Sequence, residues 1–123
     1  MIAVCAGGAA SIPLIKTQNA RRHVDAAILE SAPMRDAIMN FRRTKLYWPN
    51  AEEAEKFRVD VSSLKRARTI EWDAKKKAVV VTMAGTPFEG KKFAFNGADW
   101  QRGPQWACRP LDIDTKYLPK NCR

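Results

Sequence analysis

The chain has few of the residues that carry catalysis or bind metals. It contains one histidine, three cysteines and no CxxC pair, so no second histidine can complete a zinc site with the cysteines. Ser62-Ser63 has no base nearby in the sequence, and Gly7-Gly8 lies in an apolar run that does not suit a phosphate-binding loop. The sequence therefore predicts no enzyme, no cofactor and no metal. His23 is expected on the solvated, charged face of a helix.

The chain also lacks a long apolar run. Residues 1–15 contain no charge, but a membrane-spanning helix needs about 20 apolar residues. No basic residues precede the segment, as they would in a signal peptide. We expect this segment to be the end of something longer.

Acidic residues are scarce in the second half of the chain. Residues 1–60 carry 9 lysines and arginines against 7 acidic residues, whereas residues 61–123 carry 13 against 6, so most of the net charge of +9 lies in the second half. Such a surface attracts polyanions, among them DNA and anionic bilayers. The alternative is a basic domain with nothing bound.

The three cysteines are unevenly placed. Cys108 and Cys122 lie close to the carboxyl terminus and close a loop of 15 residues, counting both ends. We interpret them as a structural disulfide, worth roughly 3 kcal/mol in the chain-entropy model and typical of an oxidising compartment. The alternative is two reduced thiols in the cytosol. Cys5 lies in an apolar run, where cysteine behaves as a small hydrophobe; an intermolecular bridge is the alternative.

Residues 16–46 have the pattern of an amphipathic helix. Apolar residues near helical spacing form one stripe, namely Val24, Ile28, Met34, Ile38 and Phe41. Pro13 and Pro33 each remove a backbone donor and crowd the preceding turn, so they predict kinks. Two separate helices joined near Ala32 are the alternative, but the stripe continues in register past Pro33.

After residue 67 the period changes from helical to alternating. Four short strands are expected at residues 68–72, 78–83, 91–95 and 105–108. Short strands with brief connections predict an antiparallel meander, and the helix stripe can cover one of its faces. The predicted fold class is α+β: a long N-terminal helix packed on a four-stranded antiparallel sheet, with a C-terminal disulfide-bounded loop. The predicted divisions are an apolar helix segment (1–15), an amphipathic helix (16–46), a connecting loop (47–66) and the sheet region (67–123).

Several motifs occur in an order and spacing that is specific. Trp48-Pro49-Asn50 follows the predicted helix, and the two prolines stand 20 residues apart. The end of the chain reads Trp106-Ala107-Cys108, then Lys116-Tyr117-Leu118-Pro119, then Cys122-Arg123. Together they make the chain similar to the type IV pilins of Gram-negative bacteria over essentially its whole length.

The resemblance implies a structural subunit of a type IV pilus, a filament that supports attachment, twitching motility or DNA uptake. Its partners would be other pilin subunits and, before assembly, the inner membrane; it would pass from inner membrane and periplasm to the cell-surface pilus. Helix packing in a filament core favours small residues, and the first segment supplies Ala3, Ala6, Gly7, Gly8, Ala9, Ala10 and Ser11. The acidic stretch Glu52–Glu55 would meet the basic second half of a neighbour and set register.

The start of the chain departs from the family. The basic leader, the cleavage-site glycine and the early glutamate of a prepilin are absent. If Pro13 matches the first family proline, about nine residues are missing, and adding them gives about 24 apolar residues, enough for a span. A misplaced start codon, a trimmed chain and a degenerate relative are the alternatives.

A minor pilin that acts as a DNA-binding receptor for natural transformation is the second interpretation. Its candidate DNA- or polyanion-binding residues are Lys65, Arg66, Arg68, Lys75, Lys76, Lys77, Lys91, Lys92, Arg102, Arg109, Lys116, Lys120 and Arg123. Lys75–Lys77 are expected at a turn tip, and Trp100 could stack on a base. The alternative is that these lysines protect edge strands from aggregation and that Trp100 belongs to the core.

Adhesion through the terminal loop is a third interpretation. Pro110, Leu111, Ile113 and Pro119 would then offer apolar groups beside basic ones. The alternative is that Leu111, Ile113 and Leu118 pack on the sheet.

Overall fold

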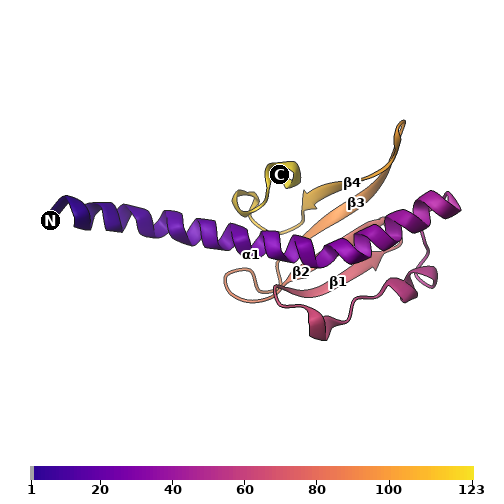
Figure 1. Ribbon diagram of the computed structural model, residues 1–123, viewed down its shortest axis with the longest axis horizontal. Helices are drawn as coiled ribbons and strands as arrows, with labels where there is room; N and C mark the ends of the chain where they lie inside the picture. The colour runs from indigo at the N-terminus through magenta and orange to yellow at the C-terminus, as the bar shows by residue number, and fades with distance from the viewer. Residues whose placement is uncertain (1) are drawn as a thin grey trace.

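The computed structural model describes residues 2–123, and it describes side chains from residue 16 onward. One long helix, α1 (Ile2–Lys45), crosses one face of a sheet and extends beyond it (Figure 1). The sheet consists of β1 (Ala67–Asp73), β2 (Ala78–Met83), β3 (Lys92–Trp100) and β4 (Gly103–Pro110). The predicted α+β fold, a long N-terminal helix on a four-stranded antiparallel sheet, is confirmed.

The strands lie in sequence order, β1-β2-β3-β4, and every neighbouring pair is antiparallel. The sheet therefore has two distinct ends. At the near end, β1 and β3 begin beside the middle of α1; at the far end, the β1–β2 and β3–β4 turns lie towards Lys45 (Figure 1). These two names are used below.

β3 and β4 are longer than the sequence predicts. The expected strands 91–95 and 105–108 become Lys92–Trp100 and Gly103–Pro110. Asn96-Gly97 has the composition of a turn, yet both residues pair with β4. Gly97 is needed there because an ideal Cβ at this position would lie 2.7 Å from the Trp48 ring. A tertiary contact thus keeps an unfavourable sequence in the strand.

The core lies between α1 and the helix-facing side of the sheet. Most buried helix residues alternate at spacings of three and four, as a single stripe requires: Ala20, Val24, Ala27, Ser31, Met34, Ile38 and Phe41. Met39, beside Ile38, is also buried. Four of the five stripe residues expected from the sequence are buried, whereas Ile28 is half-buried at the edge of the stripe. The sheet contributes buried Ile70, Val79, Val81, Phe93 and Phe95.

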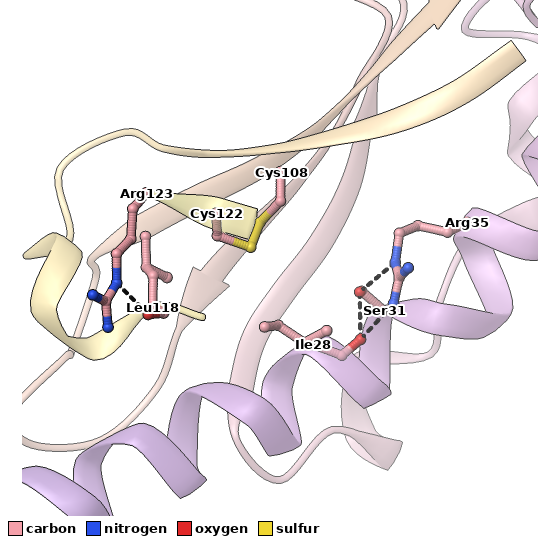
Figure 2. The surroundings of a disulfide bond; sticks show 7 residues. All are labelled: Ile28, Ser31, Arg35, Cys108, Leu118, Cys122 and Arg123. Carbon is pink, nitrogen blue, oxygen red and sulfur yellow. Dashed lines mark hydrogen bonds between the residues drawn. A yellow bond between two sulfur atoms is a disulfide. The ribbon is translucent and has the colours of Figure 1, made fainter. Parts of the chain in front are cut away.

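Helix α1 continues through Pro33, so the alternative of two helices is wrong. Figure 1 shows that α1 changes direction along its length; the assignment of a kink to Pro33 stays a prediction. The Ile28 carbonyl, one turn before the proline, accepts bonds from Ser31 Oγ at 2.6 Å and Arg35 Nη2 at 3.0 Å (Figure 2). Ser31 is fully buried and also accepts a bond from Arg35 Nε, so this polar group is satisfied inside the core.

Two predictions fall on residues whose side chains lie outside the described part of the chain. These are the kink at Pro13 and the role of Cys5. Within the residues that the structure describes, none of the helices has the length and hydrophobicity that a membrane crossing requires.

Two reciprocal hydrogen bonds fix the first turn of the connection from α1 to β1. Asn50 and Glu53 form a reciprocal capping box: Asn50 Oδ1 accepts the Glu53 N–H at 2.7 Å, and Glu53 Oε1 accepts the Asn50 N–H at 3.1 Å. Two short 3-10 turns follow within the predicted connecting loop, Glu53–Phe57 and Val61–Ser63. Trp48 and Pro49 are buried, so this loop begins inside the core.

The C-terminal tail folds back against β4. The predicted disulfide is present between Cys108 and Cys122, with the Cα atoms 4.4 Å apart (Figure 2). Ile113 and Leu118 are buried, as the packed-loop alternative expects, whereas Leu111 is 55 % exposed. Arg21 Nε of α1 donates to a tail carbonyl, that of Lys116, at 2.9 Å.

Candidate interaction surfaces

The predicted polyanion-binding residues are all exposed, but the fold does not bring them together. Lys65, Arg66, Arg68, Lys91 and Lys92 lie at the near end, where β1 and β3 begin. Lys116, Lys120 and Arg123 belong to the tail, and Arg109 lies on β4 opposite Ala94. Lys75, Lys76, Lys77 and Arg102 occupy the two turns of the far end. A single continuous stripe is therefore not formed.

Acidic residues accompany the basic residues of the near end. Arg68 forms an ion pair with Glu89, and Lys116 Nζ lies 3.9 Å from Asp114 Oδ2. Asp112 Oδ1 accepts the backbone N–H of Lys92. These carboxylates reduce the positive potential that a polyanion would meet at this end.

Glu30 of α1 fixes the start of the near end. Its carboxylate accepts the backbone N–H groups of Lys65, Arg66 and Ala67 at 2.6, 2.9 and 2.8 Å. Burial disfavours the charged form, but these three donors together outweigh it and hold the pKa of Glu30 below its usual value. No local signal in the sequence reveals that Glu30 has a partner 35 residues away.

We expect Glu30→Gln to destabilise the protein by about 1 kcal/mol at neutral pH, because hydrogen bonds to a charged acceptor are the stronger ones and this carboxylate is partly screened by solvent. The folded-state pKa is lowered, so the stabilisation is complete above the unfolded pKa of about 4.3 and is lost as the pH falls below it. Urea unfolding of both proteins from pH 7 to pH 3 measures this. A difference between them that stays constant down to pH 3 would contradict the assignment.

The far end has basic side chains without acidic partners. Within residues 16–123, no ion pair involves the side chains of Lys75, Lys76, Lys77 or Arg102. Asp73 Oδ1 accepts the backbone N–H groups of Lys75 and Lys76, both at 3.1 Å, which fixes the turn and leaves the ammonium groups free to point into solvent. The basic side chains of the far end therefore remain available to a polyanion.

Trp100 stands at the tip of the β3–β4 hairpin and is 58 % exposed, so the alternative that places it in the core is wrong. An open concavity of about 530 Å³ lies beside it, lined by Asp99, Trp100, Gln101, Arg102 and Gln105. The other three tryptophans, Trp48, Trp72 and Trp106, contact one another at centroid distances of 5.3–6.2 Å. Trp100 is thus set apart from the aromatic cluster of the core.

The expectation that His23 is a solvated surface residue is wrong. Its Nε2 lies 2.9 Å from the carbonyl oxygen of Ala84, and its ring meets Phe88 edge to face at 5.5 Å. A carbonyl only accepts, so Nε2 is the donor. The β2–β3 loop folds back over α1 to make these contacts, and helical periodicity cannot indicate such a loop.

Asp99 also makes long-range contacts that the sequence does not reveal. Its Oδ1 accepts bonds from Arg42 Nε and Trp48 Nε1, both at 3.2 Å, and pairs with Arg42 Nη2 at 3.0 Å. These bonds join the far hairpin to the end of α1, across 57 and 51 residues of chain. Within the described residues, no three histidine, cysteine or carboxylate groups come together to hold a metal ion.

Helix α1 extends past the sheet (Figure 1), and charged side chains are exposed at both ends of the domain. Residues 20–123 match the Pilin family, described as a bacterial filament, and the chain belongs to that family. The predicted family and the prediction of no enzyme are both confirmed, since pilins are structural proteins that polymerise with other pilin subunits in surface pili. A comparison with curated proteins finds no match.

Proposed function

We propose that this pilin is a structural subunit of a type IV pilus, held in the inner membrane before assembly and exposed on the cell-surface filament afterwards. The observation that carries the proposal is that α1 extends beyond the sheet. The helix begins at Ile2, but Ala20 is its first buried position among residues 16–123, so its N-terminal part extends beyond the sheet (Figure 1). That part holds the small residues that close helix packing favours.

The exposed face of α1 supports the same arrangement. Leu29 is 72 % exposed although it lies in the middle of the helix. A large apolar group in this place suits contact with a neighbouring subunit. Immunogold labelling with an antibody against the sheet domain tests the proposal directly. Label along sheared filaments is the expected result, and filaments without label, from cells that produce the chain, would contradict it.

We propose that the acidic loop sets the register between subunits by contact with the basic second half of a neighbour. Glu53 is unsuitable for a test, because it belongs to the capping box and also accepts the Tyr47 hydroxyl at 2.8 Å. Glu52 and Glu55 are exposed, and within residues 16–123 the one ion pair of Glu55 is with Arg58, three residues on, at 3.3 Å.

We expect Glu52→Lys with Glu55→Lys to reduce the yield of sheared pili at least about tenfold, because like charges would then face each other between subunits. The melting temperature should change little, because exposed charges contribute little to stability. The matched control is Glu52→Gln with Glu55→Gln, which removes charge without reversing it and should have a smaller effect. Normal pili in the charge-reversal variant would contradict the register proposal.

A DNA-binding role is the second candidate, and the unpaired basic turns of the far end favour it. We expect the full chain to shift a DNA duplex at low salt, with a slope of log K against log salt of about −3 to −4 for four phosphate contacts. Replacing Lys75, Lys76 and Lys77 by Gln should flatten the slope by about 3. The control replaces Lys65, Arg66 and Lys91 by Gln at the near end. No shift at low salt, or loss of binding only in the control, would contradict the role of the far end.

A further inference from the structure

The end of the β3–β4 hairpin is a rigid projection. The last pair between β2 and β3 joins Ala78 to Asn96, whereas β3 and β4 continue to pair as far as Trp100 and Gly103. The Gly97 N–H donates to the Lys77 carbonyl at 2.7 Å, and the outer part of the extension is supported from the helix side. Trp48 packs under Gly97, and Asp99 is bonded to Arg42 and Trp48.

Trp100 points away from that support. Successive side chains of a strand point to opposite faces, and Asp99 points towards α1. Trp100 therefore lies on the outer face of the sheet, where its cross-strand partner is Gly103, which has no side chain to cover the ring. An indole that is 58 % exposed contributes little to the fold, yet the hairpin holds it in a fixed place.

The groups around Trp100 suit a ligand rich in hydroxyls. Gln101 and Gln105 carry amides that both donate and accept, and Arg102 donates. The concavity they share with Trp100 measures about 530 Å³, within the range of about 300–1,000 Å³ that small ligands occupy. Gln105 pairs with Ala98 and so lies on the same outer face as Trp100, one diagonal step away.

We propose that this concavity binds a β-linked pyranose oligosaccharide, with one sugar ring stacked on Trp100. Pyranoses whose ring substituents are equatorial, such as glucose and N-acetylglucosamine, present only C–H groups on their faces, and these meet the electron-rich face of an indole favourably. Sugar hydroxyls donate and accept hydrogen bonds, as the two amides require. A phosphodiester only accepts, so it fits Arg102 but not the oxygens of the two amides.

Sugar binding would give the pilus a ligand for attachment. A role in attachment therefore rests on the pilus-subunit proposal. Binding itself does not need a filament. The full chain can therefore be titrated as a monomer, in a detergent without a sugar head group, with cellotetraose, with chitotetraose and with single-stranded oligothymidylate. Intrinsic tryptophan fluorescence reports the contact, because Trp100 is exposed while the other three indoles are packed together.

At least one of the two sugars should change the emission with a Kd of about 1 mM or tighter. Trp100→Ala should weaken that binding at least about tenfold, measured by calorimetry, and Trp100→Tyr should keep most of it. Leu111→Ala, another exposed apolar residue, is the matched control and should bind normally. Both Trp100 variants should keep the wild-type unfolding midpoint and should form pili in cells.

Three results would overturn the proposal. The first is no response to either sugar at up to about 10 mM, well above the expected Kd. The second is sugar binding that survives in Trp100→Ala or is lost in Leu111→Ala, which would place the site elsewhere. The third is a response to oligothymidylate alone, which would assign Trp100 to nucleic acid. None of them would affect the pilus-subunit proposal, which immunogold labelling tests separately.

Discussion

Replacing Cys122 by Ser should lower the free energy of unfolding by about 3 kcal/mol or more. The disulfide with Cys108 spans a sequence separation of 14, for which the chain-entropy model gives about 3 kcal/mol. Cys122 is only 1 % exposed and lies in the main core cluster. A serine hydroxyl at that place is buried among apolar groups, which adds a further cost. In a domain of this size the loss corresponds to a fall in Tm of roughly 10 °C.

The double variant Cys108→Ala, Cys122→Ala separates the cost of losing the crosslink from the cost of burying a serine hydroxyl. It removes the crosslink without burying a hydroxyl or leaving a free thiol, so it should lose about 3 kcal/mol, less than Cys122→Ser. Urea unfolding under non-reducing conditions measures both variants, and the amount of sheared pili shows whether the tail is needed for assembly. Cys122→Ser with wild-type stability and normal pili would show that the tail is held by its packing alone.

The tail shows how far the sequence can predict this region. Two cysteines near the terminus predict the disulfide, and their order relative to tryptophan and proline is one of the motifs behind the family resemblance. The packing of the tail is harder to predict. Ile113 is buried and Leu111 exposed, two residues apart in a segment without regular periodicity. That outcome depends on the position of α1, from which Arg21 holds the tail carbonyl of Lys116.

The helix and the sheet were predictable because both rest on periodic patterns. The apolar stripe of α1 and the alternation in β1 and β2 each depend on local sequence. The contacts that position the candidate surfaces are long-range. Glu30 meets the start of β1, and Asp99 meets Arg42 and Trp48, through pairs separated by 35 or more residues. A charged residue on an exposed helix face gives the same local pattern whether or not a distant loop docks on it.

The same distinction explains the basic residues. Composition correctly indicates a positively charged surface, but it cannot show that Arg68 and Lys116 pair with carboxylates while, within residues 16–123, the basic side chains of the far end form no ion pair. The exposure of Trp100 also depends on the register between β3 and β4. Pairing with Gly103 leaves its ring uncovered, whereas a shift by one residue would move it to the helix side. The proposed sugar site of the far end therefore follows from the β3–β4 register.

That register depends on the fit between Gly97 and Trp48, so Gly97→Ala should be strongly destabilising. An ideal Cβ at Gly97 would lie 2.7, 2.8 and 3.0 Å from three carbon atoms of the Trp48 ring. Trp48 cannot move aside easily, because it packs between Trp72 and Trp106 and donates to Asp99. Overpacking of this kind typically costs about 1–3 kcal/mol, and we expect about 2 kcal/mol in urea unfolding.

A double-mutant cycle with Trp48→Phe tests the contact itself. A phenyl ring is shorter than an indole, so Gly97→Ala should cost much less in the Trp48→Phe background, with a coupling of about 1 kcal/mol or more. The matched control is Ala98→Val, which adds two methyl groups on the outer face one residue away and should be nearly neutral, since β-branched residues suit strands. Additive effects of Gly97→Ala and Trp48→Phe would show that the glycine is required for a reason other than this contact. Coupling in the cycle, together with altered exposure of Trp100 in Gly97→Ala, would instead link the core contact to the surface of the far end.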